Sequence, residues 1–107
     1  MLNEITVPML QDAYEKTGSI PLKRAWSKTR GTVCGECAIH ALYSAGYDVP
    51  LWELRSGVAK HIYFRGFMEG WDVGNYAALT GNEEINRGIA DGQRCREALN
   101  PVLPVDL

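Results

Sequence analysis

Residues 65–70 read Arg-Gly-Phe-Met-Glu-Gly, and residues 87–92 read Arg-Gly-Ile-Ala-Asp-Gly. Both segments follow one pattern, Arg-Gly-apolar-x-acid-Gly. Glycine costs about 1 kcal/mol relative to alanine inside a helix, so four such glycines need compensation. Glycines four residues apart lie on one helical face and allow a second backbone to approach closely. We therefore expect two helices that cross at these glycines, within one chain or across a dimer interface.

The residues around the two segments support helices there. Apolar residues repeat at three- and four-residue steps over 58–71, which predicts a packed helix. Thr80 and Glu83 have the spacing of a capping box, so a second helix is expected to start there and end at Leu99. The functional alternative is a ligand or metal pocket cleared by the glycines, with acids at its rim. Its rim residues would be Glu69, Asp72 and Asp91, which lack the spacing of a calcium loop.

Three further helices are predicted upstream. The first spans about 7–17, with Thr6 as its N-cap and a glycine at its end. The second, over 34–45, carries small and apolar residues at helical spacing and is expected to be buried. A short third helix follows a cap at Asp48. Residues 19–33 show no helical period and predict a loop or a small β-hairpin.

These elements define the fold class. The chain of 107 residues is 46% hydrophobic and 22% charged, which is typical of one globular domain. We expect a mainly α fold, a compact bundle of four or five helices with at most a small β-hairpin. The helices over 34–45 and 58–71, together with the one that ends at Leu99, are expected to form the core.

Charge and hydropathy exclude several classes of protein. The formal net charge is −2 and the pI is about 5.6, which argues against nucleic-acid binding because phosphate contacts need a basic excess. No stretch approaches the ~18 apolar residues of a membrane span. The first residues lack the pattern of a secretory signal, so we expect a cytosolic protein with reduced thiols.

The charges are distributed unevenly along the chain. Residues 16–35 carry only basic charges, whereas residues 66–107 carry seven acids and three bases. Such asymmetry can steer a partner or favour association between copies. The predicted partner-binding residues are Lys23, Arg24, Trp26, Lys28 and Arg30.

Cys34-Gly35-Glu36-Cys37 is the tetrapeptide with the clearest chemical potential. At a helix N-terminus, such a motif can lower the pKa of its first thiol. Redox activity would need a βαβ setting, and a zinc site would need two more ligands from His40, His61 or Cys95. The remaining interpretation makes Cys37 and Cys95 small core residues. The sequence predicts no metal and no other cofactor.

A cysteine peptidase is a further alternative. Cys34-Gly35 at the start of a buried helix, followed by Val-Pro-Leu-Trp-Glu-Leu over 49–54, is similar to the nucleophile helix of bacteriocin-processing, papain-like peptidases. That resemblance implies a downstream histidine oriented by an aspartate or asparagine. His61 is the one later histidine, and it lies within a predicted helix.

Four pieces of the chain carry a second resemblance. They are Tyr-Glu-Lys-Thr-Gly over 14–18, Cys-Gly-Glu-Cys over 34–37, and the two glycine segments that start at Arg65 and Arg87. Together they resemble an uncharacterised family of small bacterial proteins. The resemblance implies a shared fold and carries no functional residues to this chain.

Two functional hypotheses follow. The first is a small cytosolic interaction protein that self-associates or binds a protein partner through the basic stretch around Trp26. The second is a thiol-dependent enzyme or metal-binding protein that uses Cys34 and Cys37. The charge asymmetry and the glycines motivate the first, and the spacing of the two cysteines motivates the second.

Overall fold

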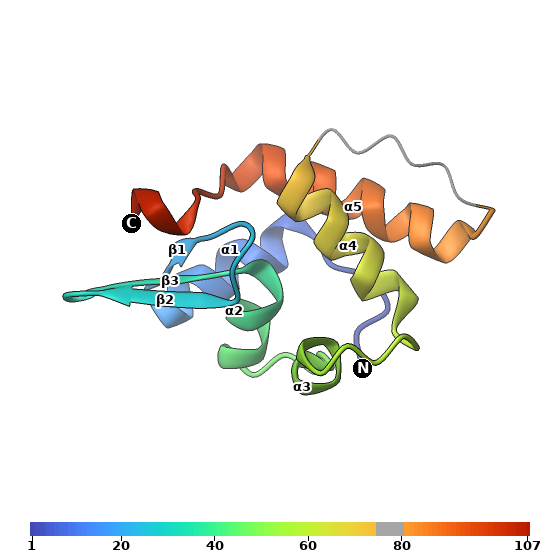
Figure 1. The fold of residues 1–107 in the computed structure, drawn as a ribbon, viewed down its shortest axis with the longest axis horizontal. Helices are drawn as coiled ribbons and strands as arrows, with labels where there is room; N and C mark the ends of the chain where they lie inside the picture. Colours follow the sequence, from blue (N-terminus) through green and yellow to red (C-terminus); the bar gives the residue numbers. More distant parts are fainter. Residues whose placement is uncertain (75–80) are drawn as a thin grey trace.

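The computed structural model describes residues 1–74 and 81–107, and two of its helices pack against each other on one side of the molecule (Figure 1). These are α4 (Ile62–Val73) and α5 (Glu83–Leu99). The described residues form three other α-helices, three strands and a short 3-10 turn. Their bounds are α1 Val7–Thr17, α2 Ala38–Ser44, α3 Leu51–Arg55, β1 Ile20–Pro21, β2 Ser27–Arg30, β3 Val33–Glu36 and η1 Pro104–Asp106. The fold is mainly α with a small sheet, as the sequence predicts.

The four glycines of the repeat lie at the contact between α4 and α5, which confirms the predicted crossing within one chain. A β-carbon on Gly66 would collide with the carbonyl oxygen of Ile85, and one on Gly88 would collide with that of Tyr63. Gly70 and Gly92 face the opposite backbone in the same way. Each helix therefore uses its glycines to bring the partner backbone into direct contact.

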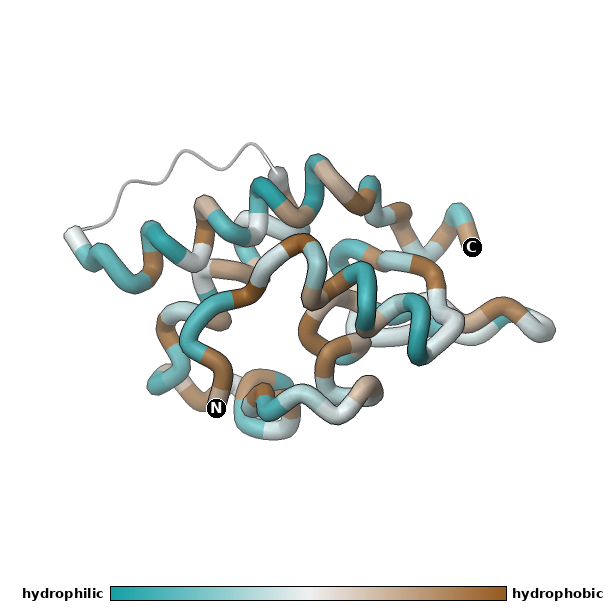
Figure 2. The backbone as a smooth tube through the Cα atoms, turned by 180° about the vertical axis from the view of Figure 1, so that it is seen from behind, coloured by the Kyte–Doolittle hydropathy of each residue, from teal (hydrophilic) through white to brown (hydrophobic). Residues whose placement is uncertain are grey.

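The main apolar core lies where α1, α2, α3 and α4 meet, and α5 adds the buried Cys95 and the partly buried Leu99 to it. Helix α1 thus has a larger share than predicted and α5 a smaller one. The reason is that α5 meets α4 through glycines rather than through large side chains. The smaller contribution of α5 to the core can be followed in Figure 2, where many hydrophilic residues lie along this helix. Trp71 and Phe67 of α4 are the largest fully buried side chains.

The sheet has the order β1-β3-β2, with β3 parallel to β1 and antiparallel to β2. The predicted hairpin exists, but it extends to Glu36 and not only to Val33. The prediction that a helix starts near Cys34 is therefore wrong, because residues 33–36 form the central strand. Two residues connect β2 to β3, and one of them is Gly31 with a φ of 62°, a conformation that glycine adopts without strain.

Helix ends agree with the sequence at some positions and differ at others. Thr6 caps α1 and Gly18 ends it, as predicted. Asp48 does not cap α3, because its carboxylate pairs with the N-terminal amine of Met1 at 2.7 Å; Pro50 takes the cap position. The predicted cap Thr80 lies outside the described residues, and Asn82 caps α5.

Helix α4 begins at Ile62, four residues later than predicted. Lys60 and His61 both contact the carboxylate of Glu53 on α3, which holds the segment before α4 against that helix. Within the described residues, no helix combines the length and apolar character needed to cross a membrane.

Candidate functional site

The two cysteines of the C-x-x-C motif lie on different elements. Cys34 is a partly exposed residue of β3, where its sulfur lies 3.8 Å from the Thr29 hydroxyl. Cys37 is buried and caps α2, and its sulfur accepts a hydrogen bond from the backbone N–H of His40 at 3.4 Å. The helix N-terminus therefore acts on the second thiol and not on the first.

Burial outweighs the helix N-terminus at Cys37. Desolvation raises the pKa of this thiol to about 12, although hydrogen bonds from the backbone of His40 and Ile39 act in the opposite direction. Burial likewise raises the pKa of Cys95 to about 11. Neither thiol is activated for nucleophilic attack, since the thiolate is the reactive form.

The residues between the two cysteines serve packing and hydrogen bonding. A β-carbon on Gly35 would lie 2.7 Å from Cγ of Leu22, so only glycine leaves room for that buried leucine. The buried Glu36 carboxylate accepts hydrogen bonds from Ser19 at 2.8 Å and Ser44 at 2.9 Å, and it lies 2.6 Å from Nδ1 of His40. Burial alone would raise the pKa of Glu36, but these hydrogen bonds lower it overall.

The histidines do not complete a cysteine site. His40 is held by Glu36, and His61 contacts Glu53 through Nε2. Among residues 1–74 and 81–107, no group of three or more histidine, cysteine or acidic side chains is placed to hold a metal ion. The arrangement thus gives no support to the peptidase or zinc interpretations.

The basic stretch separates into two parts. Lys28 and Arg30, on β2, donate to the carbonyl oxygens of Pro104 and Leu107 at 2.7 and 2.9 Å. Their charges therefore lie against the C-terminal segment. The structure does not bring these two side chains together with the remainder of the predicted binding residues.

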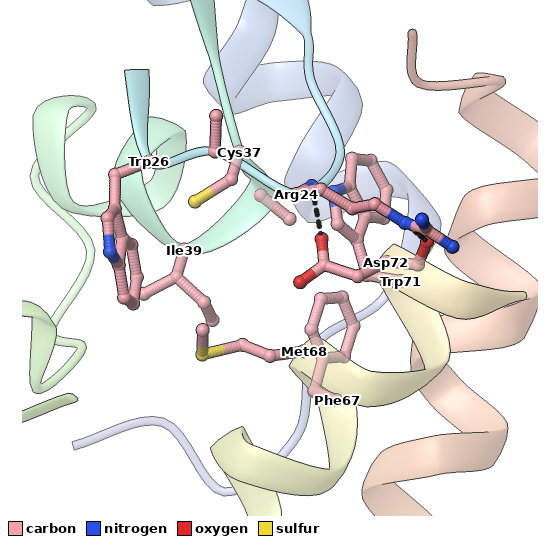
Figure 3. A pocket seen from close by; sticks show the side chains of 10 residues that line it. Arg24, Trp26, Cys37, Ile39, Phe67, Met68, Trp71 and Asp72 are labelled. Atoms are coloured by element: carbon pink, nitrogen blue, oxygen red, sulfur yellow. Dashed lines mark hydrogen bonds between the residues drawn. The ribbon is translucent and has the colours of Figure 1, made fainter. Parts of the chain in front are cut away.

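The other part of the basic stretch leads into a pocket. The backbone N–H of Lys23 binds the carbonyl oxygen of Val102 at 3.0 Å. Arg24 follows with a φ of 64° and donates its backbone N–H to Oδ1 of Asp72 at 2.8 Å. Trp26 is half-buried and forms one wall of the cavity (Figure 3). Two of the five predicted binding residues, Arg24 and Trp26, thus belong to one site.

This pocket lies between the start of α2 and the C-terminal half of α4, and its volume is about 260 Å³. In Figure 3, Trp26 stands on one side, Phe67 and Trp71 on the other, and Met68 below. The complete lining consists of Arg24, Ala25, Trp26, Cys37, Ala38, Ile39, Phe67, Met68, Trp71 and Asp72. The walls are therefore mostly aromatic and aliphatic, with one carboxylate among them.

Asp72 gives the pocket its polar character. Its Oδ1 accepts the Arg24 backbone N–H, while Figure 3 shows the second carboxylate oxygen directed toward the pocket. Burial raises the pKa of Asp72, although the Arg24 backbone N–H and the charges of Arg24 and Arg96 act against this. Both guanidinium groups bind backbone carbonyls instead of this carboxylate: Arg24 binds that of Asp72, and Arg96 binds those of Trp71 and Asp72.

An exposed aromatic cluster adjoins the pocket through Trp26. The guanidinium of Arg55 lies over the rings of Trp26 and Trp52, at 5.7 and 5.4 Å from their centroids. The Trp52 indole donates to the Tyr43 hydroxyl at 3.1 Å, and the two rings meet edge to face. Trp52 is 61% exposed and Tyr43 42% exposed. We call these four residues, Trp26, Tyr43, Trp52 and Arg55, the aromatic patch.

The three acids predicted for the rim of a pocket at the glycines, Glu69, Asp72 and Asp91, do not line one common cavity. Asp91 is buried and binds the Tyr63 hydroxyl at 2.6 Å and the Arg94 guanidinium at 2.8 Å. A hollow of about 350 Å³ does lie at the contact of the two helices, lined by Gly66 and Glu69 among others, but neither Asp72 nor Asp91 lines it. Of the three rim candidates, only Asp72 lines the cavity beside Trp26.

Sequence reasoning missed most of the pocket and of the aromatic patch. Ile39 and Met68 lie on faces that also serve the helical core, and their spacing does not distinguish the two roles. Arg55 and Trp52 lie on a five-residue helix, α3, which is too short for a clear period. The sequence did mark three of the lining residues, Arg24 and Trp26 in the basic stretch and Asp72 among the acids near the glycines.

Comparisons complete the description of the site. Neither the protein-family models, nor the curated proteins, nor the solved structures contain a significant match to this chain. The resemblance to a family of small bacterial proteins stays a prediction.

Proposed function

We propose that this protein is a binding module that recognises a protein partner through the pocket and the adjoining aromatic patch. The observation that carries the proposal is the position of Trp26, which is shared by a side-chain-sized pocket and by an exposed Tyr-Trp-Arg cluster. Tryptophan, tyrosine and arginine are the residues most enriched among those that dominate binding energy at protein interfaces.

The size of the pocket favours a side chain over a larger ligand. Pockets for drug-sized ligands measure about 300–1,000 Å³, whereas this one measures about 260 Å³. A single residue of a partner would occupy such a space while its neighbours cover the aromatic patch. Trp52, which is 61% exposed, is a residue of the type whose truncation at an interface often costs about 2 kcal/mol or more of binding energy.

The burial and protonation of the cysteines favour a binding function over a function that uses thiol chemistry. Cys37 lines the pocket, but burial keeps its thiol protonated at neutral pH. Cys34 is on the neighbouring strand, where its sulfur lies close to the hydroxyl of Thr29. The three free thiols fit the cytosolic location that we retain as part of the proposal.

Self-association has less support than a different partner. The glycines that suggested a dimer meet within one chain, at the contact of α4 and α5. Lys28 and Arg30 lie against the C-terminal segment of the same chain, so part of the charge asymmetry is also used internally. We therefore assign the pocket and the aromatic patch to a partner that is not a second copy.

A random-peptide display on the immobilised full chain tests the proposal. We expect a recurring motif among bound peptides, with binding lost in Trp26→Ala and Trp52→Ala. Val105→Ala is the matched control, because Val105 is an exposed apolar residue on η1, outside the patch. The proposal fails if no motif is enriched, or if the two tryptophan variants bind the enriched peptides as tightly as the wild type.

A further inference from the structure

The chemistry of the pocket restricts which groups can bind in it. The main restriction comes from the carboxylate of Asp72. One carboxylate oxygen is directed toward the pocket and the other already accepts the Arg24 backbone N–H. In the described part of the chain, no basic side chain forms an ion pair with this carboxylate, although Arg24 and Arg96 lie near it. The pocket therefore presents a half-buried anionic oxygen without a cationic partner.

Such an oxygen discriminates between guests. A purely apolar guest would strip water from the oxygen without replacing its hydrogen bond, which disfavours binding. An anionic guest would add repulsion from Asp72, and in Figure 3 the Arg24 guanidinium points away from the cavity. A guest that brings a positively charged donor satisfies the oxygen and gains a charge-assisted hydrogen bond.

The walls suit the same guest. The π-faces of aromatic rings attract cations, and here Trp26 already lies beneath the Arg55 guanidinium. Phe67, Met68 and Ile39 provide apolar surface on which an aliphatic stem can pack. An occupant with a hydrocarbon chain and a cationic end therefore matches both parts of the pocket.

We infer that the pocket receives a lysine side chain of the protein partner, with the ammonium group at Asp72 and the methylene stem against Trp26, Phe67 and Met68. This inference rests on the proposed function and specifies the anchor residue of the partner. Lysine fits better than arginine because a planar guanidinium favours two carboxylate oxygens at once, and Oδ1 of Asp72 is already engaged.

Titration of the full chain with three capped amino acids, followed by amide chemical shifts, tests the assignment. The probes are the Nα-acetyl N-methylamides of lysine, norleucine and arginine; norleucine has an aliphatic stem like that of lysine but no ammonium. We expect lysine to bind the wild type about tenfold more tightly than norleucine, with the largest shifts around Trp26 and Asp72. In Asp72→Asn the preference should vanish, while Glu97→Gln, which changes an exposed acid on α5, should leave it intact.

Each other outcome contradicts the lysine assignment. Equal binding of lysine and norleucine would show that the ammonium is not recognised, yet it would leave the pocket as a site for an apolar side chain and the proposed function intact. Tighter binding of arginine would give the site to a guanidinium. Absence of binding by all three probes would show that the pocket is not a site for a side chain, and the peptide display would then decide separately whether the aromatic patch binds a partner.

An unchanged amide spectrum of Asp72→Asn away from the pocket confirms that this variant is folded.

Discussion

Gly70 of α4 lies directly against the backbone of Ile89 on α5. A β-carbon at position 70 would collide with the carbonyl oxygen of Ile89 and would lie 2.9 Å from the backbone nitrogen of Gln93. Gly88 has the reciprocal relationship with Tyr63 on α4. Both obstacles are backbone atoms within helices, which cannot rotate away as a side chain can. The two helices must separate to admit even one methyl group.

Gly70→Ala therefore tests the contact between α4 and α5. We expect the free energy of unfolding to fall by about 1–2 kcal/mol, because overpacking against a rigid backbone costs up to about 3 kcal/mol and exceeds the ~1 kcal/mol that alanine gains over glycine in a helix. Urea unfolding monitored by circular dichroism measures the change. Gly81→Ala is the control, since a β-carbon there meets no atom within 4 Å. Equal stability of Gly70→Ala and the wild type would contradict the close contact.

The glycine repeat was readable from sequence because its spacing has one geometric meaning on a helix. The N-cap Thr6 and the terminal glycine of α1 were readable for the same reason, since both are local signals. The start of α2 was not readable, because Cys34 belongs to a strand whose partners lie at residues 20–21 and 27–30. Pairing between segments distant in sequence outweighed the local helical pattern there.

The cysteines differ in accessibility, and alkylation measures that difference. Burial raises the pKa of Cys37 to about 12, so this thiol stays protonated at pH 8. We expect iodoacetamide to modify the partly exposed Cys34 first and to modify Cys37 and Cys95 only after denaturation. Mass spectrometry of peptides from native and unfolded samples identifies the sites. Rapid modification of native Cys37 would restore the thiol-dependent alternative.

Glu36 links stability to pH. Its hydrogen bonds lower its pKa in the folded state below the usual value, so the stabilisation is present at neutral pH and is lost as the pH falls through the folded-state pKa. Glu36→Gln should lower the free energy of unfolding at pH 7 by about 1–3 kcal/mol, because an amide cannot accept all three donors. The deficit relative to the wild type should shrink in acid. Glu15→Gln, at an exposed position of α1, should show neither effect.

Asp72 links stability to pH in the opposite direction from Glu36. Burial raises its pKa in the folded state, so the protonated form is favoured by folding and the contribution to stability declines as the pH rises through that pKa. Asp72→Asn keeps an acceptor for the Arg24 backbone N–H and removes the buried charge. We expect the variant to be at least as stable as the wild type at pH 7, with the difference absent at pH 3. A clear loss of stability at pH 7 would show that the carboxylate is a structural requirement.

The binding of lysine should follow the ionisation of Asp72. The pKa of this carboxyl is raised, so the carboxyl becomes protonated at a higher pH than an ordinary aspartate does. As the pH is lowered, affinity for the lysine probe should therefore begin to fall earlier than it would at an ordinary aspartate. Titrations at several pH values between 4 and 8 measure this dependence, with the norleucine probe as control. A lysine affinity that does not change over this range would contradict recognition by the Asp72 carboxylate.

The candidate site was less predictable than the fold because its residues come from separate parts of the chain. Arg24 and Asp72 are 48 positions apart and meet through two hydrogen bonds, one from the backbone N–H and one from the guanidinium of Arg24. Trp26 likewise meets a residue distant in sequence, because its ring lies under the guanidinium of Arg55 on α3. Sequence could mark Trp26 and Asp72 separately, but no local pattern indicates that they line one cavity.

Intermolecular nuclear Overhauser effects between the lysine probe and the full chain test the central claim most directly, because they report contact and not only affinity. The structure predicts effects from the methylene protons of the probe to the ring protons of Trp26 and to the ε-methyl group of Met68. Effects to another surface of the molecule, with none to these two residues, would contradict the assignment of this pocket as the binding site.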